Sequence, residues 1–408
     1  GIESPIQRLG RRGFLTSAAS GTGLLALAHQ LAEGASGRDP LEPKAAHGLP
    51  KAKACICIYL EGGPSQMDLF DPKPKLNELH GQKLPESLTQ KVRFAFIQKE
   101  GARVLGSPRK FSRHGQCGME LSDLLPYLSR HADDMALIRS MHTEAFNHHP
   151  GQLLMNTGAP VFGRPSMGAW LNYGLGSLSR DLPGYVVLSS GRGTSGGTSN
   201  WGSGFLPSTY QGVLFRNQGD PVLNLSNPPG VDSSMQEATI RALGRLGADQ
   251  YKHLGDPEIA SRVESYELAF RMQASVPEVM DISRESVATL EAYGAKPGES
   301  SFANNCLLAR RLVEQGVRYV QLFDWGWDFH GTGPSDVWIA RSSNSNGEIL
   351  HYDGSSWSST FVANGPIWSR LLAYATRPKR LTVPYVGFTP TMPHSAAGWR
   401  MEPPVSLP

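Results

Sequence analysis

Cysteine is scarce in this chain, and neither sign of charge dominates. There are only four cysteines in 408 residues. Cys55 and Cys57 alternate within an apolar run that predicts a strand, which disfavours a disulfide or a joint metal site between them. We interpret both as small buried apolar side chains. The 39 Lys and Arg nearly balance the 36 Asp and Glu, so the sequence indicates no nucleic-acid partner.

A stable transmembrane span is also missing from the N-terminal region. The apolar run after Leu15 is interrupted by His29, Gln30 and Glu33, and a spanning helix needs about 20 apolar residues. Arg11 and Arg12, followed by a run diluted with Ser, Thr and Gly, are instead typical of a twin-arginine export signal. The alternative, an ordinary amphipathic helix, is disfavoured because the run has no polar face. We therefore expect a partner in the twin-arginine export machinery and a periplasmic or other extracytoplasmic location.

Four segments follow from composition and patterning. We predict a signal segment over 1–36, a linker over 37–53, an α/β domain over 54–335 and an irregular tail over 336–408. A charged helical insertion is expected within the domain, over 234–295. Strand-like runs alternate with helical patterns up to residue 335, which predicts a mostly parallel sheet with helices on both faces.

The predicted strands are short apolar runs, and the predicted helices carry recognisable ends. A continuous apolar run predicts a buried strand at Cys55–Leu60. Further strands are expected at 135–139, at "GYVVLSS" and at "VRYVQLF", with helices starting near Ser166 and ending at Gly316. The glycine-rich loop after "GYVVLSS" has no Lys-Ser/Thr ending, so it is not a phosphate-binding P-loop.

Polar clusters follow three of these strands. They comprise Glu61 to Asp68 with Asp71, then Asn147-His148-His149, and finally Asp324, Asp328 and His330. Sites in open parallel sheets form beyond the carboxyl ends of the strands, and carboxylates with imidazoles are the usual ligands of Zn and similar ions. Each cluster also has a structural interpretation: helix caps and turns for the first two, and a packed aromatic corner for the third.

Three stretches, "YLEGGPSQMDLFDPKP", "RSMHTEAFNHHPGQLLMNTG" and "LLARRLVEQGVRYVQLFDWGWDFHG", carry a family resemblance. Together with the leader, they resemble the twin-arginine-exported bacterial domain-of-unknown-function family 1501, a branch of the alkaline phosphatase/sulfatase superfamily. The resemblance implies a metal-dependent phosphatase- or sulfatase-like hydrolase acting on a small anionic ester. It also implies that Asp68, Asp328 and His330 bind a divalent ion, which would be Zn, Mn, Ca or Fe.

The sulfatase signature, Cys-x-Pro-Ser-Arg with a later Thr-Gly, can be laid over the second stretch. Pro150 matches its proline and Thr157-Gly158 its end, so that His148 stands at the nucleophilic cysteine and Gln152 at the arginine. An imidazole cannot become formylglycine, which excludes the usual sulfatase mechanism. His148 and His149 are then expected to act as metal ligands or as the general acid and base.

From about residue 336 the resemblance ends. We find neither strand nor helix periodicity there, and a Gly-Arg-Thr motif expected from the family is absent. We interpret the tail as translated out of frame or otherwise degenerate, and we expect weak catalysis or none. The sequence thus leaves two functions open: a metal-dependent ester hydrolase, or a non-catalytic exported scaffold or binding protein. Glycosidase chemistry is disfavoured because no well-spaced acid pair stands out.

Overall fold

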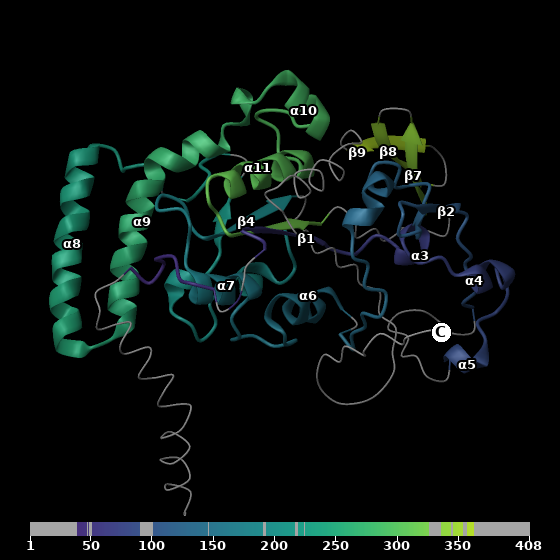
Figure 1. Cartoon of the computed structure of the whole chain (residues 1–408), viewed down its shortest axis with the longest axis horizontal. Helices are drawn as coiled ribbons and strands as arrows, with labels where there is room; N and C mark the ends of the chain where they lie inside the picture. Colours follow the sequence, from purple (N-terminus) through teal and green to yellow (C-terminus); the bar gives the residue numbers. More distant parts are fainter. Residues whose placement is uncertain are drawn as a thin grey trace, which may run out of the picture.

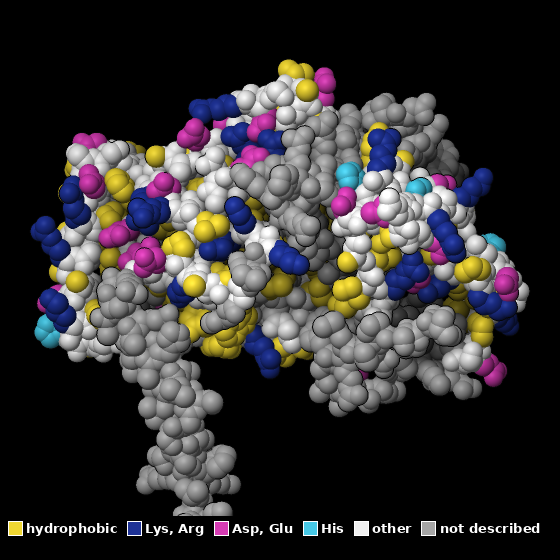
Figure 2. All heavy atoms as spheres, in the orientation of Figure 1, with side chains coloured by type: hydrophobic (Ala, Val, Ile, Leu, Met, Phe, Trp, Pro, Cys, Tyr) yellow, Lys and Arg dark blue, Asp and Glu magenta, His cyan; other side chains and the backbone are white. Residues whose placement is uncertain are grey.

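The computed structural model describes most of the chain between residues 39 and 325. The described ranges are 39–46, 48, 51–89, 101–145, 147–190, 193–216, 219–223 and 225–325, with the backbone of three strands in 336–362. The predicted signal segment therefore lies outside the described residues. Among the described helices, none is long and apolar enough to cross a membrane. On the face in Figure 2, acidic and basic side chains are interspersed.

A four-stranded parallel sheet forms the centre of the α/β part. Its strands are β1 (Cys55–Leu60), β4 (Tyr185–Ser190), β5 (Val213–Phe215) and β6 (Tyr319–Asp324), in the order β1-β6-β4-β5. The pairings β1·β6, β4·β6 and β4·β5 are all parallel. The sequence-based strands at 55–60, "GYVVLSS" and "VRYVQLF" are thus confirmed, whereas the three-residue strand β5 was not predicted.

Helices cover both faces of this sheet (Figure 1). On one face, α11 (Phe302–Glu314) packs against alternate strand residues such as Ile58, Leu188 and Leu322. On the other, α6 (His148–Thr157) and α7 (Met167–Leu175) lie over a cluster of aromatic residues that includes Tyr185 and Phe323. Burial on both faces explains why the strands read as continuous apolar runs. The expectation of helices on both faces is correct.

The predicted helix ends are close to those observed. Ser166 caps α7, its side chain accepting a hydrogen bond from the backbone N–H of Ala169. The helix α11 ends at Glu314, two residues before the expected glycine; its C-cap is Gln315, and Gly316 follows with φ +91°. A positive φ is easily adopted only by glycine, so Gly316 still turns the chain into β6.

The charged segment after residue 232 forms a helical hairpin. It consists of α8 (Ser233–Leu254) and α9 (Pro257–Met280), followed by α10 (Val287–Tyr293). Asp232 and Asp256 cap the two long helices, and Gly255 ends α8 in the left-handed conformation. In Figure 1 the hairpin stands on the β4 side of the sheet, away from β1, and the strand order places β5 on that side. The prediction of helices in this segment is confirmed, and its assignment as an insertion stays a prediction.

Between β1 and α6 the chain builds a smaller unit. It contains α3 (Gln66–Leu69), α4 (Pro74–Glu78), α5 (Glu86–Thr89) and an antiparallel pair, β2 (Phe111–His114) and β3 (Met119–Ser122). The strand predicted at 135–139 is wrong: the structure describes this segment, and it belongs to no strand. Met135 and Leu137 pack against the cluster around Phe70, so the apolar run that suggested a strand reflects contact with this cluster.

Three strands lie in the tail that was predicted as irregular over 336–408, and the rest of that prediction lies outside the described residues. Strands β7 (Asp336–Ser343), β8 (Asn346–Asp353) and β9 (Trp357–Val362) form an antiparallel meander. Runs rich in β-branched and aromatic residues, such as "DVWIA", favour strands without strict alternation, so periodicity alone did not reveal them.

Candidate functional site

Two acidic residues, Glu61 and Asp324, lie at the carboxyl edge of the parallel sheet. Leu60 and Ser190 both pair with Asp324, so the ends of β1, β6 and β4 lie side by side. The backbone N–H of Glu61 donates to the carbonyl oxygen of Asp324 at 2.9 Å. The hydroxyl of Ser190 donates to Asp324 Oδ1 at 2.7 Å. Carboxylates from two adjacent strands thus share the edge where open α/β sheets place their sites.

Glu61 is the residue at this edge that most strongly indicates a ligand site. Its side chain is only 1% exposed. Oε2 accepts a hydrogen bond from the backbone N–H of Ser195 at 3.2 Å, whereas Oε1 is buried without a hydrogen-bond partner among the described residues. Burying a carboxylate is costly unless its oxygens are paired with donors or a cation. Glu61 therefore leaves one ligand atom available at the carboxyl edge.

A polar network holds the loop that passes over this edge. Gln152 of α6 is fully buried, and its Oε1 accepts hydrogen bonds from Thr194 Oγ1 at 2.6 Å, Gly196 N at 3.0 Å and Asn200 Nδ2 at 2.8 Å. Asn156, one turn further along α6, donates to the Gln152 carbonyl oxygen and reaches Asn200. These bonds fix the loop whose Ser195 N–H donates to Glu61. Helix α6 therefore covers the sheet and also holds this loop in place at the carboxyl edge.

The two candidate histidines occupy the first turn of α6. Asn147 caps this helix, its Oδ1 accepting from the backbone N–H of His148 at 2.7 Å. The spacing of His149, Gln152 and Asn156 places them on one face of the helix. His149 Nε2 is buried with no hydrogen-bond partner among the described residues, and its ring meets Phe162 edge-on at 5.3 Å. His149 is thus the histidine with an unused nitrogen near the Gln152 network.

Of the three predicted metal ligands, the structure describes only Asp68. Asp68 lies in α3, beyond the end of β1 (Figure 1), and accepts a hydrogen bond from the Ser107 hydroxyl. Asp71 pairs with Lys73 at 2.7 Å. None of the hydrogen bonds or ion pairs found in the described residues joins Asp68 to Glu61 or Asp324. Asp328 and His330 lie outside the described residues, so their role as ligands stays a prediction.

Glu61 and Asp324 were named at the strand ends, but the sequence did not single them out as ligands. Each sits directly at a strand end, and this position was the signal that distinguished them from Asp68. Within the part of the chain that the structure describes, no three or more His, Cys, Asp or Glu side chains gather closely enough to hold a metal ion. A complete ligand set would have to include residues outside that part.

The thiols of β1 do not take part in this chemistry. Burial raises the pKa of Cys55 to about 12, with a further contribution from Cys57. Burial also raises the pKa of Cys57. Metal binding requires thiolates, and these thiols stay protonated at neutral pH. Both cysteines are packed as apolar side chains, with free thiols.

Comparison with known families identifies the family of this chain. The sequence profile of the family described as "Protein of unknown function (DUF1501)" matches residues 52–338. The chain belongs to this family. The matched range contains β1, α6, β4 and β6, which build the carboxyl edge. No curated protein and no solved structure matches this DUF1501 chain.

Proposed function

We propose that this DUF1501 chain is an exported relative of metal-dependent phosphate and sulfate ester hydrolases, with a divalent cation held at the carboxyl edge. The observation that carries the proposal is the buried Glu61 carboxylate with an unpartnered Oε1, beside Asp324. The mostly parallel sheet with helices on both faces agrees with the alkaline phosphatase/sulfatase architecture, and we assign the chain to that architecture as part of the proposal.

The residues at the edge fit a hard divalent cation. Carboxylate oxygens are the preferred ligands of such ions, and Glu61 and Asp324 provide them from adjacent strands. Asp328 and His330 follow Asp324 closely in sequence and would complete the set. When bound, the ion would polarise a phosphoryl or sulfuryl oxygen and lower the pKa of an attacking water.

The first turn of α6 supplies the groups that would handle the ester. A helix N-terminus attracts anionic oxygens through its free backbone N–H groups. His149, in that turn, has an uncommitted Nε2 that can accept a proton from water or donate one to a leaving oxygen. His148 lies beside it, half-buried. Both histidines keep the roles of ligand or general acid and base that the sequence suggested.

A second candidate function is a non-catalytic exported scaffold or binding protein, and Gln152 favours it. The side chain stands where the sulfatase signature has arginine, and its Oε1 is occupied by three hydrogen bonds from the 194–200 loop. It is therefore a structural residue, and it carries no positive charge for an anionic substrate.

Replacing Glu61 by glutamine is expected to weaken cation binding. The change keeps the side-chain shape but removes a ligand charge, and ligand charge is a main determinant of affinity. We expect the Kd for Mn²⁺ or Zn²⁺, measured by calorimetry on the full chain, to rise about tenfold or more. The exposed Glu42→Gln is the matched control. Equal affinities in both variants would rule out the site.

Hydrolysis assays separate the two functions. Metal-dependent cleavage of p-nitrophenyl phosphate or sulfate, lost in Glu61→Gln and in Asp328→Ala, is the result expected of a hydrolase. Cation binding without turnover of either ester would instead identify a scaffold or binding protein.

Export is expected to depend on the arginine pair. Twin-arginine signals are recognised through these two side chains, and Arg11→Lys with Arg12→Lys keeps the charge while removing the guanidinium groups. A reporter fused to the leader should then stay in the cytoplasm, as measured by cell fractionation. Unchanged export of the double variant would remove the basis for the proposed location.

A further inference from the structure

Large apolar side chains are exposed on the side of the molecule that α7 and its neighbouring loops form. Met167 and Trp170 of α7 are 41% and 46% exposed, and Phe205 is 69% exposed. The loop between α6 and α7 adds Val161 and Phe162, which are 57% and 64% exposed. Figure 2 shows apolar side chains gathered below α7, at the lower edge of the molecule. We call the surface formed by these five residues the apolar face.

Residues from separate segments of the chain meet on the apolar face. The rings of Trp170 and Phe205 lie edge to face, with their centroids 5.7 Å apart. The backbone N–H of Ser166 donates to the carbonyl oxygen of Gly202 at 3.1 Å, which joins the start of α7 to the 201–212 loop. A shallow hollow of about 320 Å³ lies between Met167, Trp170 and the last turn of α6. Exposed apolar surface of this kind marks contact with another protein or with a membrane.

The distribution of charge distinguishes between these two partners. Residues 147–176 and 201–212 form α6, α7 and the adjoining loops; they contain no Asp or Glu, and Arg164 is the only Lys or Arg among them. Glu258 of α9 reaches this region, but its two carboxylate oxygens accept hydrogen bonds from the backbone N–H and the hydroxyl of Ser208. In a symmetric contact between two copies of the chain, the same surface meets itself, so Arg164 would find no acidic partner there. The phosphates of an anionic bilayer would pair with it.

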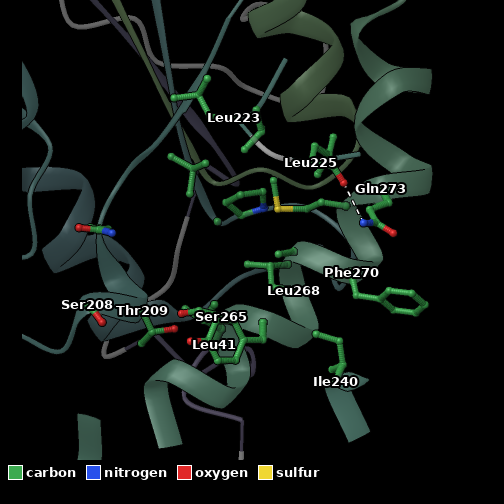
Figure 3. A pocket seen from close by; sticks show the side chains of 18 of the residues that line it. Leu41, Ser208, Thr209, Leu223, Leu225, Ile240, Ser265, Leu268, Phe270 and Gln273 are labelled. Carbon is green, nitrogen blue, oxygen red and sulfur yellow. Dashed lines mark hydrogen bonds between the residues drawn. The ribbon is translucent and has the colours of Figure 1, made fainter. Parts of the chain in front are cut away.

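The linker joins the N-terminal segment to the fold at the same helix. The Lys44 ammonium lies 5.3 Å from the centre of the Tyr173 ring, and that ring contacts Trp170 edge-on at 6.0 Å. Figure 3 shows Leu41, also of the linker, on the same side of a cavity as Ser208 of the 201–212 loop. The predicted export signal precedes these residues in the chain. During the predicted export, the segment that engages the membrane is therefore attached beside the apolar face.

We propose that the apolar face binds the surface of a phospholipid bilayer, with Trp170 and Phe205 inserted at the level of the headgroups and Arg164 paired with a lipid phosphate. Trp suits this depth because its ring is apolar while its indole N–H can still meet polar groups. Burial of apolar area supplies most of the binding, and the cation adds a preference for anionic lipids. The contact is interfacial, so it requires no helix that crosses the bilayer.

The test is co-sedimentation of the full chain with lipid vesicles. We expect saturable binding to vesicles made of equal parts of phosphatidylcholine and phosphatidylglycerol. Binding to phosphatidylcholine alone should be about fivefold weaker, which is the contribution of one cation near an anionic surface. Trp170→Ser with Phe205→Ser should weaken binding by about tenfold or more, because both inserted rings are lost.

The matched control is Leu246→Ser with Leu254→Ser. This variant also removes two exposed apolar side chains, but from α8, and it should leave binding unchanged. If thermal unfolding shows that the Trp170/Phe205 variant does not fold, Phe205→Ser alone should weaken binding by about fivefold.

Three results would overturn the proposal. The first is no binding of the wild-type chain to either kind of vesicle. The second is equal binding of the wild type and the Trp170/Phe205 variant, or of Phe205→Ser, which would place the contact elsewhere in the chain. The third is a dimer of the wild type, measured by sedimentation velocity, that the Trp170/Phe205 variant dissociates while neither protein binds vesicles. That result would assign the apolar face to a second copy of the chain.

Discussion

Replacing Gln152 by leucine is expected to lower the free energy of unfolding by about 3–5 kcal/mol. The variant removes the acceptor of three hydrogen bonds at a fully buried position. Gly196 N–H and the Asn200 amide would lose this partner, and each unsatisfied buried donor costs about 1–3 kcal/mol. The effect would be measured by urea unfolding of the full chain.

The exposed Gln250→Leu is the matched control for this variant. Gln250 lies on the outer surface of α8, and surface substitutions usually change stability by less than about 0.5 kcal/mol. A loss in Gln152→Leu as small as that in Gln250→Leu would mean that the Gln152 network does not hold the 194–200 loop. A loss confined to cation binding, with unchanged unfolding, would instead assign Gln152 to the site itself.

Gly168→Ala is expected to destabilise the protein by about 3 kcal/mol, because inserting a methyl group into a well-packed core costs about 1–3 kcal/mol, occasionally more. A Cβ at this position of α7 would lie within 2.6 Å of Cδ1 and Cζ of Tyr185. The Tyr185 ring is fully buried, and its hydroxyl donates to Gln321 Oε1 at 2.6 Å, so the ring cannot move aside without breaking that bond.

The same helix contains the control. A Cβ at Gly174, also in α7, would meet no atom within 4 Å outside its own helical turn. Alanine has the higher helix propensity by about 1 kcal/mol, so Gly174→Ala should be neutral or slightly stabilising. Thermal unfolding of both variants measures the difference. A shift of the same sign and size in both would contradict the packing of α7 against β4.

The central strands were predictable because burial on both faces of the sheet produces apolar runs that are easily recognised in the sequence. The runs that became β1, β4 and β6 are apolar at most positions and are bounded by glycine or polar residues. The segment at 135–139 shows the limit of that approach: it is also an apolar run, but Met135 and Leu137 pack on the cluster around Phe70 and the segment joins no sheet. Whether an extended segment finds a partner strand depends on contacts that are distant in sequence.

The sequence predicted where the site lies, at the carboxyl edge of the sheet, but it did not predict which residues form it. After β1 the chain turns through Gly62 and Gly63, at φ +88° and +66°, so the carboxylates beyond that turn are carried away from the strand axis. Glu61 precedes the turn and stays at the edge, while Asp68 follows it and meets Ser107. Likewise, the role of Gln152 is set by a loop more than 40 positions away, which no local pattern encodes.

The strand order has a consequence for how the chain folds during synthesis. Strand β6 lies between β1 and β4, and it pairs with both over positions 319–324. The ribosome therefore releases β1 and β4 long before the strand that joins them exists. Such non-local pairing requires the closure of long loops, which costs conformational entropy and slows folding. Until β6 emerges, two apolar strands present open edges, which are templates for aggregation. A chain that ends before position 319 would lack the central strand of its sheet, so folding is bound to the late stages of synthesis.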